Sequence, residues 1–149
     1  MSIQTQGFFV ADVAWPEVMK RLRSGATAIL PVGAACKEHG PHLPMNSDYL
    51  QASWLAASVV ERAGVVVWPV VSYGYYPAFV DYPGSCTLSR ETFTAVVVEI
   101  LQGISRAGAR RVRIINTGLS TTEPLRQAVA QAGGFDSILL LDVYDGRHY

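Results

Sequence analysis

The chain alternates between short apolar segments, which are typical of β-strands, and longer segments in which apolar residues recur at helical spacing. The strand-like segments are residues 28–32, 65–71, 111–116 and 138–143, and the helix-like segments are residues 15–23, 48–62, 90–107 and 125–132. Strands separated by helices form parallel sheets with helices on both faces. The order therefore predicts an α/β fold with three α/β/α layers around a mainly parallel sheet of about four strands.

Side-chain patterns refine this prediction. Residues 65–71 are continuously apolar, as in a strand covered on both faces, but Pro69 removes one backbone donor and favours a position near a sheet edge or a bulge. Ser89 is a good N-cap for the helix that follows it. We expect two buried helical stripes, one formed by Leu50, Trp54 and Ala57 and the other by Phe93, Val96, Val97, Ile100, Leu101 and Ile104.

Composition narrows the class of protein. The 149 residues suit one domain over residues 1–149; half of them are hydrophobic, 16% are charged, and the formal net charge is zero. Without an excess of basic residues, nucleic acid is a poor partner. Cys36 and Cys86 form no CxxC pair, and no secretory signal or membrane-crossing apolar run is present. We therefore expect a cytoplasmic protein with no nucleic-acid or membrane partner, and its low charge favours a homo-oligomer.

The densest group of chemically active side chains lies between the first strand-like segment and the helix that begins near residue 48. Its members are His39, His42, Lys37, Glu38 and Asp48. Imidazole and carboxylate are ligands that Zn²⁺ and Mn²⁺ accept. Loops that follow parallel strands share one edge of the sheet, where α/β proteins bind ligands. From spacing alone two interpretations stay open: a metal site, or a solvated loop whose histidines cap the following helix.

Three motifs resemble the creatininase (creatinine amidohydrolase) family. The first is Pro31–Gly33 (PVG), followed by His39–Pro44 (HGPHLP) and then Asp48. The second is Tyr82–Ser85 (YPGS) ahead of a long helix, and the third is the strand that ends at Asn116. The resemblance spans nearly the whole chain. It implies a creatininase-like fold and a metal-dependent hydrolase of amides or cyclic amides, with one or two zinc or manganese ions per subunit, a bridging aspartate and a hexameric assembly.

Carried over position by position, the resemblance implies roles in the first loop. His39 matches a metal ligand, and Asp48 matches the bridging carboxylate. Glu38 is a candidate ligand and catalytic residue displaced by one position, because Lys37 stands where the family has its glutamate. Lys37 and His42 are candidates for orienting the substrate or stabilising the oxyanion. Further candidates for substrate binding are Tyr73, Ser85, Thr117 and Ser120.

Two further features depart from the family pattern. Residues 117–122 carry neither histidine nor carboxylate, so each metal would lose one ligand; their hydroxyl and N–H groups suit either an anion or the capping of the next helix. The chain also ends at Tyr149, so it is either the front part of a longer protein or a form shortened at its C-terminus. Asp145 and His148 are further candidates near that end.

We therefore expect a metal-dependent hydrolase that attacks a small-molecule amide with a metal-bound hydroxide. The alternative is a catalytically degenerate relative that binds a small anion or serves as an oligomeric scaffold. A metal-free amidohydrolase that uses the Cys36 thiol competes with the simpler interpretation of Cys36 as a small residue at a strand end. The aromatic segment of residues 73–87 either walls a small-molecule pocket or packs against a neighbouring subunit.

Overall fold

The structure is a computed structural model that describes residues 6–145. One sheet of five parallel strands runs in the order β1-β3-β2-β4-β5. The strands are β1 (Phe8–Phe9), β2 (Ala28–Val32), β3 (Val66–Val67), β4 (Arg111–Asn116) and β5 (Ser137–Asp142), and the helices are α1 (Trp15–Arg23), α2 (Ser47–Arg62), α3 (Arg90–Arg106) and α4 (Thr122–Gln131). The predicted α/β class and parallel sheet are confirmed.

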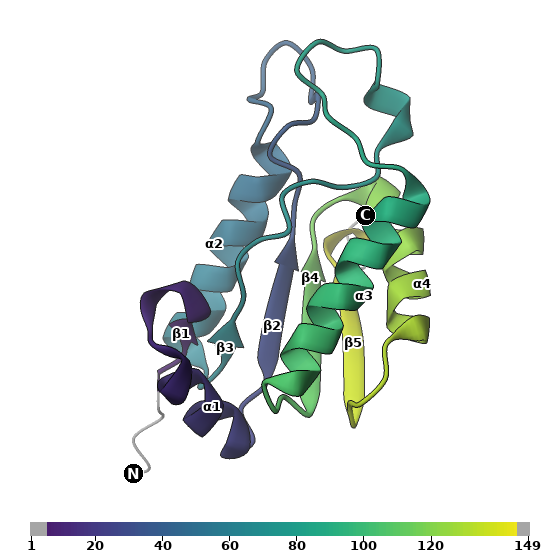
Figure 1. Cartoon of the computed structure of the whole chain (residues 1–149). Coiled ribbons are helices and arrows are strands. Elements are labelled where there is room, and N and C mark those ends of the chain that lie inside the picture. Colours follow the sequence, from purple (N-terminus) through teal and green to yellow (C-terminus); the bar gives the residue numbers. More distant parts are fainter. Residues whose placement is uncertain (1–5, 146–149) are drawn as a thin grey trace.

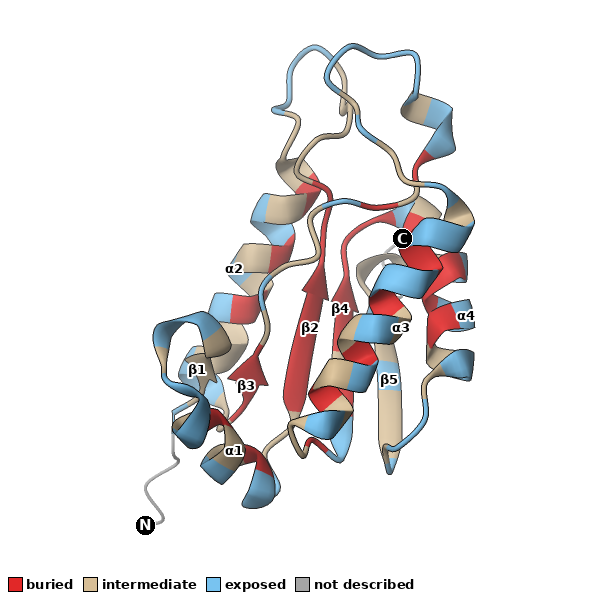
Figure 2. Ribbon diagram, viewed as in Figure 1, coloured by how far each residue is buried: buried red, intermediate tan, exposed pale blue. Residues whose placement is uncertain are grey.

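Helices cover both faces of the sheet (Figure 1). Because successive side chains of a strand point to opposite faces, each central strand contributes to two cores. Leu30 and Val32 of β2 pack with α1, α3 and α4, whereas Ile29 packs with Ala56 of α2 on the other face. β2 is buried along its whole length, whereas β5 at the edge is half-exposed (Figure 2).

The sheet contains one strand more than predicted. β1 is only two residues long and pairs with β3 through Phe8 and Val66, which is too short a segment to produce a recognisable pattern. In the predicted strand at residues 65–71, regular pairing is confined to Val66 and Val67, with a separate bridge between Val71 and Val32. Pro69 lies within this interruption, as the loss of its backbone donor predicts.

The predicted buried stripe on α2 is wrong. Trp54 is 68% exposed and Leu50 is 50% exposed, and the buried positions of this helix are instead Asp48, Ala52 and Ala56. The two alanines lie on the face of α2 that packs on the sheet, and buried and exposed positions alternate along the ribbon of this helix (Figure 2). On α3 most of the predicted stripe is confirmed, but Val96 is exposed.

The ends of the helices follow the predicted signals. The Ser89 side chain accepts a hydrogen bond from the Thr92 N–H, 3.1 Å away, and so caps α3 as predicted. α1 has the predicted bounds, with Pro16 in its first turn.

No helix among residues 6–145 is long and apolar enough to span a membrane.

The loops that follow β2 and β3 rise side by side beyond the carboxyl edge of the sheet (Figure 1). Backbone hydrogen bonds join them: Ala35 N–H donates to Ser72 O over 2.9 Å, and Cys86 N–H donates to Cys36 O over 3.0 Å. The segment that carries the candidate metal ligands is thus fastened to the aromatic segment of residues 73–87, and both lie where α/β sheets bind ligands.

Candidate functional site

The loop between β2 and α2 returns to the sheet along a defined path. Lys37 N–H donates to Met45 O over 3.1 Å, which closes the loop, and Tyr49 N–H donates to Ala34 O over 3.1 Å, which ties α2 to the end of β2. Gly40 has a φ of +83°, a conformation that favours glycine. These contacts bring the two ends of the loop together, so that residues near position 38 face the first turn of α2.

Gly33 allows three elements to meet where β2 ends. A Cβ atom at this position would lie 2.7 Å from the Thr117 hydroxyl and closer still to the backbone oxygen of Asp48. Real Cβ atoms do not make contacts this short, so any larger residue would push α2 or the loop after β4 away. The absence of a side chain at Gly33 therefore sets the position of Asp48.

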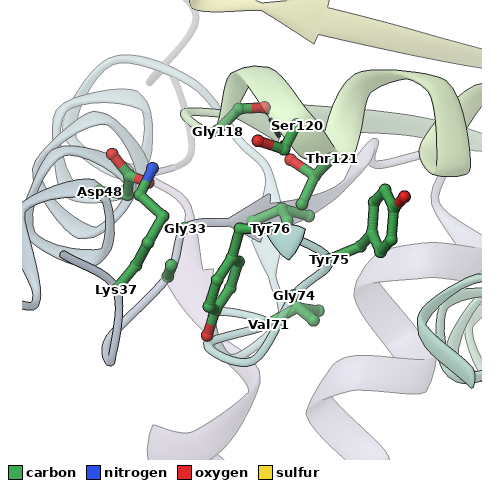
Figure 3. Close-up of a pocket in the computed structure, with 12 residues that line it drawn as sticks. Gly33, Lys37, Asp48, Val71, Gly74, Tyr75, Tyr76, Gly118, Ser120 and Thr121 are labelled. Atoms are coloured by element: carbon green, nitrogen blue, oxygen red, sulfur yellow. Dashed lines mark hydrogen bonds and ion pairs between the residues drawn. The ribbon is translucent and has the colours of Figure 1, made fainter. Parts of the chain in front are cut away.

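Asp48 is the centre of the site. It is 2% exposed and lies in the first turn of α2, where the positive end of the helix dipole stabilises a carboxylate. Its Oδ1 atom lies 2.9 Å from His39 Nε2, and its Oδ2 atom lies 2.5 Å from Lys37 Nζ. Oδ2 has a charged neighbour but no hydrogen bond of regular geometry among the described residues. Figure 3 shows Lys37 reaching this carboxylate beside Gly33.

The His39 ring is fixed through both nitrogens. Nδ1 lies 2.8 Å from the backbone oxygen of Lys37, and Nε2 faces Asp48. A backbone carbonyl on Nδ1 is a common way of orienting a histidine whose other nitrogen binds metal. His39 Nε2 and Asp48 Oδ1 are therefore two potential metal-ligand atoms that lie 2.9 Å apart and contact each other.

Lys37 is nearly buried and is held from several sides. Its side chain is 12% exposed, and its ammonium lies 5.4 Å from the centre of the Phe79 ring in addition to its ion pair with Asp48. A cation above an aromatic ring is attracted by the electrons of the ring face. The sequence placed Phe79 in the aromatic segment of residues 73–87 that could wall a pocket, but no signal related it to a lysine forty-two positions earlier.

Glu38 points away from this cluster. Its side chain accepts a hydrogen bond from the Gly40 N–H, and its own backbone N–H donates to the Ser85 hydroxyl over 3.1 Å. The predicted ligand Glu38 and the predicted substrate-binding Ser85 are thus brought together, but through the Glu38 backbone. Glu38 would have to release Gly40 to reach an ion between His39 and Asp48.

The loop after β4 contacts the backbone of the residues that form the site. The Thr117 hydroxyl is buried between two backbone oxygens, those of Val32 at 3.1 Å and Asp48 at 2.8 Å. Asn116 is fully buried and accepts hydrogen bonds from the Thr121 hydroxyl and the Gly118 N–H. Most hydroxyl groups of this loop are therefore engaged within the protein rather than free for an anion, but the predicted capping of α4 is not seen, because Thr121 at its N-cap makes no side-chain capping hydrogen bond.

A small cavity lies between Asp48, Lys37 and this loop. Its volume is about 10 Å³, which is room for about one water molecule. Ser120, a predicted substrate-binding residue, lies at its wall with Gly118, and Tyr76 closes another side (Figure 3). Burial raises the pKa of Tyr76 to about 12, and its hydroxyl donates to the Cys86 oxygen over 2.5 Å. Tyr76 is thus a neutral wall residue from the aromatic segment of residues 73–87, for which a pocket wall was one of two expected roles.

Other predicted site residues lie farther out. His42 is exposed and makes no hydrogen bond or ion pair within the described part of the chain, and Tyr73 is 48% exposed. Cys36 is a free, half-buried thiol. Asp145 is exposed and lies 4.0 Å from Arg126, and His148 lies outside the described residues.

The described side chains bring together two candidate ligands for a single metal ion, His39 and Asp48. Among residues 6–145, no three His, Cys, Asp or Glu side chains gather closely enough to hold one ion. His39 and Asp48 supply two donors, whereas catalytic zinc sites have three protein ligands. Lys37 already occupies the second oxygen of Asp48. The site is therefore a two-ligand arrangement with a fixed ammonium in contact with it.

Comparisons with known proteins place this geometry in context. The family model described as "Creatininase: Creatinine amidohydrolase" matches residues 11–141. The creatinine amidohydrolase of Pseudomonas putida is 34% identical over 118 residues, which are 75% of this chain and 45% of that enzyme. The chain thus spans less than half the length of this curated relative.

Solved creatininase structures share the fold. A zinc–zinc form of a mutant creatininase superposes with a TM-score of 0.86 at 27% identity, and the match covers 95% of this chain and 60% of that one. A manganese form gives a TM-score of 0.84 at 28% identity over 94% of this chain and 60% of that one. The predicted creatininase-like fold is confirmed by these superpositions.

Proposed function

Because the chain belongs to the creatininase family, we propose that it is a hydrolase of the C–N bond of a small amide or cyclic amide. One observation carries this proposal: His39 Nε2 and Asp48 Oδ1 meet 2.9 Å apart at the carboxyl edge of the sheet, and the ring is held in place through Nδ1. A solvated loop with two helix-capping histidines would have no reason to bury and orient one of them against a carboxylate.

His39 and Asp48 are the side chains that would hold a zinc or manganese ion, with Glu38 as a third ligand once it leaves Gly40. Such an ion would supply Lewis acidity, which polarises a carbonyl and makes a bound water more acidic. The solved relatives described as zinc–zinc and manganese forms support this choice of metals.

The other candidate residues would act on the substrate. The Lys37 ammonium is directed at the carboxylate and would favour negative charge developing beside it, which is the role of an oxyanion-stabilising group. His42 and Tyr73 are exposed on the two adjoining loops, where a substrate could contact them. Ser120 and Ser85 offer hydroxyl groups at the cavity wall and at the Glu38 backbone, and Thr117 would position Asp48 through its backbone oxygen.

A second function is favoured by the ion pair itself. Lys37 neutralises Asp48 without any metal, and the described loop after β4 adds no further ligand. This arrangement supports a relative that has lost hydrolysis and that binds a small polar ligand or serves as a scaffold in a homo-oligomer. The family motif from His39 to Asp48 is compatible with both functions, so activity has to be measured.

The test is an assay of the chain purified with Mn²⁺ or Zn²⁺ against creatinine, other lactams and linear amides, with product detected by mass spectrometry. We expect turnover of at least one substrate and its loss in His39→Ala and Asp48→Asn. Asp12→Asn, an exposed carboxylate in the turn before α1, is the matched control and should keep wild-type turnover. Equal turnover in wild type and both site variants, or none with any substrate, would refute the hydrolase proposal.

A further inference from the structure

We infer that the Lys37 ammonium takes the place of a second metal ion on Asp48, so that this site accepts at most one divalent cation. The inference deepens the proposed function, because it defines the metal content of the same site. It rests on the contacts of the two Asp48 oxygens: Lys37, drawn beside Asp48 in Figure 3, lies at Oδ2, and His39 lies at Oδ1.

A carboxylate that bridges two cations gives one oxygen to each of them. In this chain Oδ1 faces His39, but Oδ2 lies 2.5 Å from Lys37 Nζ. An ammonium is a compact positive charge, and a divalent ion at the same oxygen would meet it at close range. Like charges at this distance exclude each other, so the ammonium and a second ion are alternatives.

Lys37 is not free to move aside. Its side chain is 12% exposed, its ammonium is above the Phe79 ring, and its backbone N–H and C=O are bonded to Met45 and His39. A lysine on an open surface could swing into water when a metal arrives. This one would have to leave an aromatic ring and a buried carboxylate together.

The surroundings of Oδ2 offer a second ion neither ligands nor room. The neighbouring wall is formed by Gly118, Ser120 and Thr121, which supply hydroxyl and backbone groups but no carboxylate or imidazole. Asp142, the nearest acidic residue of β5 in this network, is bonded to Asn116 and Thr122. The cavity of about 10 Å³ holds about one water molecule, too little for an ion with its hydration shell.

Metal content measured on four proteins tests the inference without any assay of activity. Wild type, Lys37→Gln, Lys37→Glu and Lys20→Gln are dialysed against Mn²⁺, and bound metal is counted by elemental analysis and titration calorimetry. Lys20, exposed on α1, is the matched control. We expect no more than one ion per chain in wild type and Lys20→Gln. Lys37→Glu, which exchanges the ammonium for a donor, should bind a second ion or hold the first at least tenfold more tightly.

Two results would overturn the inference. One is two ions per chain in wild type. The other is a folded Lys37→Glu protein whose metal content and affinity equal those of wild type. If Lys37→Glu does not fold, the number of ions bound by wild type and the Mn²⁺ affinity of Lys37→Gln still test the inference. Lys37→Gln should bind Mn²⁺ more tightly than wild type, because it lacks the competing ammonium. A chain with one ion but no amidase activity would refute the proposed function alone, which keeps the two failures apart.

Discussion

Replacing Lys37 with methionine removes the ammonium and keeps most of the side-chain volume. The carboxylate of Asp48, 2% exposed, then loses the ammonium that lies at its Oδ2 atom. Breaking a buried ion pair by removing one partner costs about 3–5 kcal/mol. His39 still contacts Oδ1, so we expect the lower end of that range, about 3 kcal/mol. For a chain of this size about 2–4 °C is lost per kcal/mol, so Tm should fall by roughly 6–12 °C.

Calorimetry and urea unfolding of metal-free protein measure this loss. The double variant Lys37→Met/Asp48→Asn removes the orphaned charge and should be more stable than the sum of the two single variants predicts, by about 1–3 kcal/mol. Lys20→Met changes an exposed lysine on α1 and should stay within about 0.5 kcal/mol of wild type. Mn²⁺ should restore part of the Tm of Lys37→Met, since a bound cation replaces the missing charge.

The reasoning is refuted if Lys37→Met unfolds within about 0.5 kcal/mol of wild type, the range of ordinary surface substitutions. It is also refuted if the two single changes are additive in the double variant. Either result would mean that the ion pair contributes nothing to the folded state, and that Lys37 has no firm position beside Asp48.

Three further changes test other parts of the account. Ser89→Ala removes the cap of α3 and should cost about 1 kcal/mol in urea unfolding, whereas Ser89→Asp should retain most of it. Phe93→Ala empties a fully buried position and should cost about 3–5 kcal/mol, but Trp54→Ala, at a site 68% exposed, should cost far less. Burial raises the pKa of Tyr76 to about 12 in the folded protein, whereas the unfolded chain loses the same proton near pH 10. The free energy of unfolding should therefore fall as the pH rises from 10 to 12. Tyr76→Phe should remove this part of the pH dependence.

Regular elements were predictable from local patterns. The bounds of β2, β4 and α1 match the predicted ranges of residues 28–32, 111–116 and 15–23. Patterns failed where tertiary packing decided the outcome. Leu50 and Trp54 lie at helical spacing, which predicted a buried stripe. Ala52 and Ala56 on the opposite face of α2 are buried instead, and the two larger side chains are exposed. β1 is too short to show any periodicity.

The site was predictable as a set of residues but not as a set of contacts. Motif spacing identified His39 and Asp48, and the structure brings them within 2.9 Å of each other. The contact between Lys37 and Asp48 depends on the path of the loop, which is closed by the hydrogen bond from the Lys37 N–H to Met45 O. No local sequence pattern specifies this path. Phe79 reaches the site from another loop for the same reason. The orientation of Glu38 toward Gly40 likewise depends on one turn of the backbone.

The assembly, the location in the cell and the boundaries of the domain stay predictions. A homo-oligomer is predicted from the low charge and from the family resemblance. Trp54 and Leu50 are exposed on α2, where a second subunit could cover them. The mass of the protein in solution, measured by light scattering, tests this prediction. Hexamers would match the resemblance, and a monomer at all concentrations would contradict the prediction.

The most direct test of the central claim is a crystal structure of the wild-type chain grown with excess Mn²⁺ and recorded with anomalous scattering from manganese. We predict at most one manganese peak at this site, bound by His39 and Asp48 Oδ1, with the Lys37 ammonium still on Oδ2. Two manganese peaks on Asp48 with Lys37 turned into solvent would contradict the account.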